Sequence, residues 1–265
     1  MAQYMVGFIG AGNMGGALAA AACKATDPQR VIVADRDEAK TAALSARTGC
    51  AVGENAAVVQ NSQFVFLGVK PQMLSAVAAE LKPLFTERVV LVSMLAGVTT
   101  ERLALEFGEM PIIRIMPNTP AAIGEGMILY TANAAVTDEE KCAFVQLLSA
   151  AGQLDEIPEA LIDAGSAVSG CGPAFVYLFI EALADAGVQC GLPRDKALQY
   201  AAQTVCGAGR MAVTDGRHPA ALKDAVCSPG GSTIEGVHAM EDGAFRGVVM
   251  DAVQASFERT KELGK

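Results

Sequence analysis

The 265-residue chain has no tryptophan, two histidines and no cysteines in a C-x-x-C spacing. With only His218 and His238, the chain has few histidines from which to build a catalytic histidine pair or a Ser-His-Asp triad. The seven cysteines are an odd number without metal-ligand spacing, which is typical of reduced thiols and predicts no metal site. These shortages argue against histidine-based hydrolysis and against zinc chemistry.

The chain also lacks an uninterrupted apolar run long enough to cross a membrane, although 52% of its residues are hydrophobic. The richest stretch, residues 167–180, is broken by polar residues, glycines and a proline, which favours a buried helix over a membrane span. We expect the excess apolar content to contribute to a subunit interface. The basic residues are scattered in a chain of net charge −9, which argues against nucleic-acid binding. No basic or cleavable leader precedes the first strand-like residues, so a cytoplasmic location is expected.

The first half alternates between apolar, strand-like runs and helical stretches. We predict strands at residues 4–9, 30–34, 50–52, 64–69, 89–93, 112–116 and 127–131. Strands separated by helices imply right-handed crossovers and a mainly parallel sheet with helices on both faces. The predicted fold class is therefore α/β, with an N-terminal Rossmann domain.

The second half of the chain has a different composition and residue spacing. From about residue 161 the β-branched runs disappear, and Ala, Leu, Met and Gly recur at helical spacing between four prolines. This pattern predicts four or five helices. We place the boundary near Ile157-Pro158, which gives a dinucleotide-binding domain at 1–158 and an all-helical domain at 159–265.

A glycine-rich motif, Gly10-Ala11-Gly12-Asn13-Met14-Gly15, follows the first predicted strand and precedes an alanine-rich helix. In this position the backbone can approach a pyrophosphate at a helix N-terminus. Asp35 lies 20 residues beyond Gly15 and ends the next strand, where a ribose-binding acid belongs. Together these features predict a dinucleotide site rather than a turn kept for packing alone.

Asp35 and Arg36 favour different cofactors. A carboxylate accepts a hydrogen bond from the ribose of NAD and repels a 2′-phosphate, whereas an arginine can clamp that phosphate or be only a solvated loop charge. We expect NADP, with NAD as the alternative. The loops at 69–71, 95–97 and 116–120 should line the nicotinamide side, because ligands bind at the carboxyl ends of strands in open α/β sheets.

A second motif, residues 227–235 with the sequence Cys-Ser-Pro-Gly-Gly-Ser-Thr-Ile-Glu, leads from a turn into a predicted helix. Successive backbone N–H groups from Gly230 to Thr233 can form a nest for a small carboxylate. The alternative is structural. Ser232 and Glu235 have the S-x-x-E spacing of a capping box, which would satisfy the helix end without a ligand.

Over nearly its whole length the chain resembles the pyrroline-5-carboxylate reductase family. The resemblance rests on residues 7–15, 69–71, 96–99, 117–120, 168–174, 191–193 and 218–235, of which the last block is the most specific. It implies NAD(P)H-dependent reduction of the ring imine of 1-pyrroline-5-carboxylate to L-proline, the last step of proline biosynthesis. It also implies that the helical domain forms a homodimer by interleaving with its partner, and that dimers can assemble into decamers.

The resemblance assigns roles by position. It implies that the cofactor contacts Gly10, Ala11, Gly12, Asn13, Met14, Asn55, Val69 and Lys70, and that Ala96 lies near the nicotinamide. It implies that the substrate carboxylate binds Ser228, Gly231, Ser232 and Thr233. Thr233 is the candidate that orients the ring nitrogen or relays its proton. The family commonly has a glutamate just before His218-Pro219, where this chain has Asp215.

Two other functions fit part of the pattern. A β-hydroxyacid dehydrogenase would need a lysine facing the substrate, but Lys196 and Lys223 lie in no recognisable signature, and Lys223 beside Asp224 is typical of a solvated pair. A non-catalytic dinucleotide sensor would explain residues 228–233 only as a helix cap.

Overall fold

The computed structural model describes residues 2–85 and 89–263. Its internal contacts divide the chain into two units, one formed by residues up to 171 together with those from 256 onward, and the other by residues 172–255. The helix that follows Pro158 thus groups with the first unit. The domain boundary at residue 158 remains a prediction.

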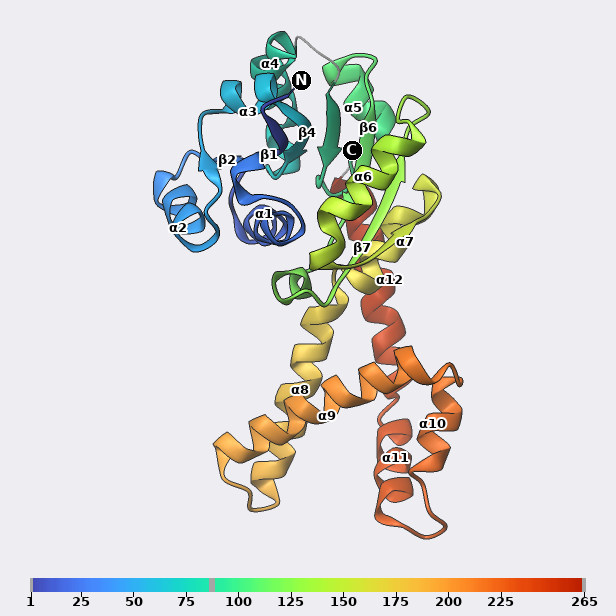
Figure 1. Cartoon of the computed structure of the whole chain (residues 1–265). Helices are drawn as coiled ribbons and strands as arrows, with labels where there is room; N and C mark the ends of the chain where they lie inside the picture. Colours follow the sequence, from blue (N-terminus) through green and yellow to red (C-terminus); the bar gives the residue numbers. More distant parts are fainter. Residues whose placement is uncertain (1, 86–88, 264–265) are drawn as a thin grey trace. The chain divides into compact units, whose positions relative to one another are not determined.

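The first unit is built around a sheet that has eight strands within the described residues, in the order β3-β2-β1-β4-β5-β6-β7-β8 (Figure 1). The strands are β1 (Tyr4–Ile9), β2 (Val31–Ala34), β3 (Ala51–Val52), β4 (Ser62–Leu67), β5 (Val90–Ser93), β6 (Ile112–Met116), β7 (Gly126–Ala132) and β8 (Gly152–Glu156). Strands β1 to β6 are parallel, β7 is antiparallel to β6, and β8 is parallel to β7. The predicted α/β class with a mainly parallel sheet is confirmed.

Strand β8 was not predicted from the sequence. Its five residues, Gly-Gln-Leu-Asp-Glu, carry a single large apolar side chain, and none of them is fully buried. It lies at the edge of the sheet beside β7, where one side faces no further strand. Pairing with a neighbour, rather than its own composition, therefore makes this segment a strand.

Helices on both faces cover the sheet. They are α1 (Asn13–Ala25), α2 (Glu38–Thr48), α3 (Asn55–Asn61), α4 (Leu74–Leu81), α5 (Thr100–Phe107), α6 (Asp138–Leu148) and α7 (Glu159–Ser169). Their ends follow local sequence signals. Asp37 caps the start of α2 by accepting from the Ala39 N–H, and Gly49 ends it in a left-handed conformation with φ 79°.

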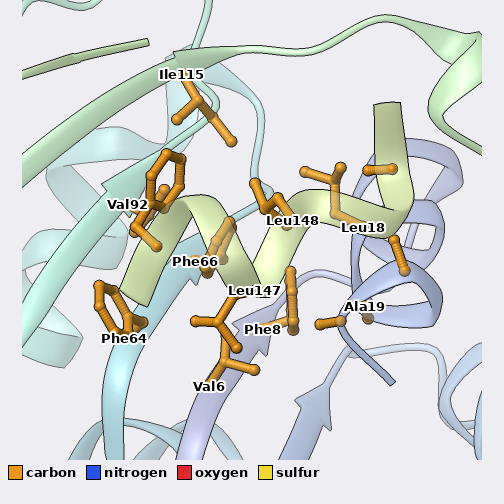
Figure 2. Packing of buried hydrophobic residues seen from close by; sticks show 14 of the residues in the cluster. Val6, Phe8, Leu18, Ala19, Phe64, Phe66, Val92, Ile115, Leu147 and Leu148 are labelled. Atoms are coloured by element: carbon orange, nitrogen blue, oxygen red, sulfur yellow. The ribbon is translucent and has the colours of Figure 1, made fainter. Parts of the chain in front are cut away.

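Two apolar layers, one on each face, hold the sheet. Alternate residues of a strand point to opposite faces, so Phe64 and Phe66 join one layer while Val65 and Leu67 join the other. In the first layer the rings of Phe8 and Phe66 lie 4.5 Å apart. Figure 2 shows these rings meeting side chains from α1 and α6. Burial of each such side chain stabilises the fold by roughly 1.5–3 kcal/mol, which fixes the strand ends that carry the site.

The second unit is helical, as predicted. It contains α8 (Gly172–Gln189), α9 (Arg194–Asp215), α10 (Pro219–Ala225), α11 (Ser232–Asp242) and most of α12 (Phe245–Leu263). Within the described residues from 159 onward there are six helices, so the prediction of four or five was too low. The break at Gly170-Cys171 separates α7 from α8, and the short α10 is a helix of its own.

Helix α8 is not buried within the chain, which corrects the prediction of a buried helix at 167–180. Its Tyr177 and Leu178 are 59% and 65% exposed. By length and composition alone, the helical segment 159–189 would suffice to cross a membrane. An 18-residue stretch within it has a mean hydropathy of 1.5, and 11% of that stretch is buried. One such helix is weak evidence for a span, because an apolar helix that pairs with another subunit has the same composition.

Candidate functional site

The glycine-rich loop lies where the order of the strands reverses. Strand β1 lies between β2 and β4, which is the crevice position in a doubly wound sheet. The loop is fixed to both neighbours, since the Gly10 N–H donates to the Ala34 carbonyl (2.8 Å) and the Gly68 N–H donates to the Ile9 carbonyl (2.8 Å). Backbone groups at the start of α1 are therefore held at the carboxyl edge of the sheet.

The three glycine positions of the motif differ in what a larger side chain would meet there. Gly10 has φ +103°, and a Cβ there would lie 2.5 Å from the Gly68 carbonyl oxygen. A Cβ on Gly15 would lie 2.0 Å from the Gly10 oxygen, which would force helix and strand apart. Apart from its neighbours in the chain, no atom of the described residues lies within 4 Å of a Cβ on Gly12, whose φ of −67° any residue can adopt. The open space at Gly12, at an uncapped helix start without acidic residues, fits a pyrophosphate.

Asp35 braces the glycine-rich loop. One carboxylate oxygen accepts from the Ala11 N–H at 2.7 Å, and the other accepts from the Asp37 N–H at 2.9 Å. Arg36 is exposed, and its guanidinium has no hydrogen bond or ion pair among the described residues. The acid predicted to bind ribose is thus already bonded to the loop, while the neighbouring cation remains able to meet a phosphate.

The other predicted cofactor residues follow neighbouring parallel strands. Asn55 begins α3 after β3, and its amide donates to Glu80 at 2.8 Å. Val69 and Lys70 follow β4. Ala96 follows β5 in a turn where the Val98 N–H donates to the Leu95 carbonyl (3.4 Å). Because these strands are parallel, the structure brings all these residues to the edge that carries the glycine-rich loop.

A cavity of about 710 Å³ opens between α1 and α2 beside the loop. Ala11, Gly12 and Asn13 line one part of it. Its cationic side chains are Lys24, Lys40 and Arg47. This charge suits an anionic ligand.

The second motif folds into a tight turn followed by a helix. The Gly231 N–H donates to the Ser228 carbonyl at 3.0 Å, with Pro229 second in the turn and Gly230 third at φ +67°. These features fit a type II turn, which needs glycine in the third position. A Cβ on Gly231 would lie 2.3 Å from Ser228 Oγ, so a side chain there would displace the Ser228 hydroxyl.

The predicted capping box is wrong. Helix α11 begins at Ser232, and its N-cap is Gly231, which has no side chain to accept a hydrogen bond. Ser232 therefore lies inside the helix, one position too late to cap it, and Glu235 cannot complete the box. The N–H groups of the first turn of α11 thus remain available to an anion.

The charged residues around α10 pair with one another. Arg217 binds both carboxylate oxygens of Asp215, at 2.5 and 2.8 Å, and lowers the pKa of this carboxyl below its ordinary value. His218 Nδ1 accepts from the Ala220 N–H and caps α10. Lys223 pairs with Asp224 at 2.6 Å, which confirms the interpretation of a solvated pair.

Sequence reasoning missed a buried arginine. Arg114, in β6, is 1% exposed and lies 2.5 Å from Asp163 and 3.6 Å from Glu159, both in α7. The signal was a lone charge within the apolar run 112–116. Among the described residues, no group of three or more His, Cys, Asp or Glu side chains has an arrangement that could hold a metal.

Two family models match the chain. Residues 5–97 match a model described as NADP oxidoreductase, coenzyme F420-dependent. Residues 159–263 match a model described as pyrroline-5-carboxylate reductase dimerisation. The exposed apolar residues of α8 therefore lie in a dimerisation domain.

Individual relatives extend over the whole chain. The chain is 43% identical to the pyrroline-5-carboxylate reductase of Pisum sativum, with 98% of this chain and 96% of that protein covered. It is 40% identical to the Escherichia coli (strain K12) enzyme of the same name, with 99% of each covered. Among solved structures, it is similar to the Plasmodium falciparum pyrroline carboxylate reductase with NADP bound (TM-score 0.89, 32% identity, 100% of both chains). It is also similar to the Coxiella burnetii pyrroline-5-carboxylate reductase (TM-score 0.91, 32% identity, 99% of both chains). The chain belongs to the pyrroline-5-carboxylate reductase family.

Proposed function

We propose that this protein reduces the C=N bond of 1-pyrroline-5-carboxylate to give L-proline, with NADPH as the reductant. One hydride adds to the imine carbon, the electron pair of the C=N π bond moves to the ring nitrogen, and this nitrogen takes one proton from water, so that C=N becomes CH–NH. The observation that carries this proposal is the uncapped start of α11 behind the Ser228–Gly231 turn, which offers backbone donors to a small carboxylate. NADPH supplies the hydride when it is bound.

The cofactor end uses the first unit. The N–H groups at the start of α1 bind the pyrophosphate in the open space at Gly12, and Asp35 holds the loop that presents them. Arg36 meets the 2′-phosphate, which favours NADPH over NADH. Asn55, Val69 and Lys70 contact the nucleotide, and Ala96 lies at the nicotinamide.

The substrate end uses the second motif. The N–H groups of Ser232 and Thr233 bind the substrate carboxylate, which lies against Gly231, and the Ser228 and Ser232 hydroxyls add hydrogen bonds. Thr233 orients the ring nitrogen. A cyclic imine is basic enough to be partly protonated in water, so hydride delivery depends mainly on positioning and charge placement. This chemistry agrees with a chain that has two histidines.

Asp215 stands where the family commonly has a glutamate. In this chain Arg217 holds it as a carboxylate, since an ion pair that lowers the pKa disfavours the protonated form. We assign Asp215 no proton-donor role.

The dimerisation domain supports assembly. We propose a homodimer in which the helical domains interleave, and dimers that can assemble further into a decamer. The apolar residues exposed on α8 support a covering partner of this kind. The enzyme would act in the cytoplasm, which cell fractionation tests.

One set of assays separates the candidate functions. NADPH oxidation is followed with 1-pyrroline-5-carboxylate, NADP reduction with a 3-hydroxy acid, and cofactor binding without turnover. We expect oxidation with the first substrate only. Turnover of the hydroxy acid alone would point to a β-hydroxyacid dehydrogenase, and binding without turnover to a sensor.

A further inference from the structure

A carboxylate from α7 caps the start of α5. Glu159 accepts from the Thr100 backbone N–H at 2.7 Å with one oxygen and from the Thr100 hydroxyl at 2.7 Å with the other. Thr100 is the first residue of α5, whose own N-cap, Thr99, accepts from Arg102. The Thr100 N–H has no carbonyl partner within its helix, so Glu159 satisfies it and favourably meets the positive end of the helix dipole.

A buried cation orients this carboxylate. The Arg114 guanidinium lies between Glu159 and Asp163, and its Nε has no hydrogen-bond partner among the described residues. A buried charge is stable only when it is paired, so Arg114 requires both carboxylates to face it. Glu159 is thereby held from two sides, by Arg114 on β6 and by Thr100 on α5.

The segment next to Thr100 is the loop that ends β5. Within it, Leu95 and Val98 are buried in the core, and Gly97 has φ +73°. Ala96 packs against an apolar cluster that includes Ile162 of α7. The core therefore fixes the side chains of Leu95 and Val98, and the hydrogen bonds that Thr100 donates to Glu159 hold the backbone where the loop enters α5.

We propose that Glu159 is a positioning residue, which through Thr100 holds residues 95–99 in the conformation that receives the nicotinamide end of the cofactor. Arg114 and Asp163 keep the Glu159 carboxylate in place for this task. The proposal rests on the proposed reductase function, because that function places the nicotinamide at Ala96. It also makes the first helix of the matched dimerisation segment part of the cofactor site.

The test uses two substitutions that nearly preserve the size of the side chain, together with control variants. Thr100→Val removes only the hydroxyl, Glu159→Gln removes the charge, and the double variant combines them. Thr100→Ser keeps the hydroxyl and removes only the methyl group. Arg102→Ala removes an exposed ion pair with Glu106 on the same helix and is the matched control. For each full-length variant we measure Kd for NADPH by the fluorescence of the bound nucleotide, kcat and KM with 1-pyrroline-5-carboxylate, and the unfolding midpoint.

We expect Kd and KM for NADPH to rise about fivefold in Thr100→Val and in Glu159→Gln, the loss typical of one hydrogen bond. The double variant should be no worse than the worse single one, since both substitutions weaken the same connection between Thr100 and Glu159. Thr100→Ser and Arg102→Ala should resemble the wild type. Unchanged NADPH binding in both single variants, or losses that multiply in the double variant, would overturn the proposal. A wild-type protein inactive on 1-pyrroline-5-carboxylate would refute the proposed function instead, while the NADPH affinities would still test Glu159.

Discussion

At the scale of single residues, the glycines of the motif at 10–15 have different roles, one in packing and another in binding. Gly15 has to be a glycine because the Gly10 backbone lies against it. At Gly12, by contrast, a Cβ would meet no atom of the described residues apart from its neighbours in the chain. The same residue type in one short loop thus serves the fold at one position and, in our proposal, the cofactor at another.

This difference predicts the outcome of two matched substitutions. Gly12→Ala should lower the free energy of unfolding by less than about 1 kcal/mol, the scale of a helix-cap change, and should abolish NADPH binding. Gly15→Ala should lower the free energy of unfolding by about 2–3 kcal/mol, because its clash is with backbone. Urea unfolding and NADPH titration of both variants provide the test. Equal stability losses, or normal NADPH binding by Gly12→Ala, would contradict the assignment.

Asp35 and Arg36 should also differ. Because Asp35 bonds to the Ala11 N–H, Asp35→Ala should weaken NADPH and NADH by a similar factor, about fivefold for one hydrogen bond. Arg36→Ala should raise the KM for NADPH about tenfold or more, the loss of a charge-assisted pair, and should leave the KM for NADH unchanged. A loss confined to NADH in Asp35→Ala would instead make that acid a ribose ligand.

At the scale of elements, the start of α11 carries the substrate argument. A capping Ser232 would make the helix end self-sufficient, but the helix begins at Ser232 and leaves its first N–H groups without a side-chain partner within the described part of the chain. The turn at Ser228–Gly231 holds these groups in place.

Ser232→Ala should therefore change the free energy of unfolding by less than about 0.5 kcal/mol, whereas loss of a real N-cap costs about 1 kcal/mol. The KM for 1-pyrroline-5-carboxylate should rise, because a donor to the carboxylate is lost. Thr233→Ala should lower kcat, and a variant with full kcat would remove Thr233 from catalysis. Thermal unfolding and steady-state kinetics measure both effects.

The elements also show which features the sequence can predict. The central strands were predictable because both faces of the sheet are buried, so that each strand is a continuous apolar run such as Phe64 to Leu67. The S-x-x-E spacing gave a wrong prediction of the N-cap. The turn at Pro229 and Gly230 makes the helix begin at Ser232, and this start depends on backbone geometry that the spacing does not report. The link between Thr100 and Glu159 joins residues 59 apart, and only the packing of α7 brings them together.

At the scale of the whole molecule, composition could not show what covers α8. An apolar helix has the same composition whether its own chain or a second copy buries it. In this structure Leu178 is 65% exposed within the single chain. The segment that contains α8 matches a dimerisation model, which supports our proposal that a second copy covers this helix.

Leu178→Asp should therefore weaken self-association about 100-fold or more, as expected for a central apolar contact. Leu105→Asp is the control, because Leu105 is 74% exposed but lies on α5, outside the matched dimerisation segment. Sedimentation equilibrium of both variants gives the association constants. If both variants associate as the wild type does, this face of α8 is not the interface.

In our proposal the glycine-rich motif binds the reductant and the motif at 227–235 binds a small cyclic imino acid. The most direct measurement is NADPH oxidation by the purified protein with 1-pyrroline-5-carboxylate, together with detection of L-proline. We expect one proline formed for each NADPH oxidised, and no NADP reduction with a 3-hydroxy acid. Turnover of the hydroxy acid without any proline formation would contradict the proposal.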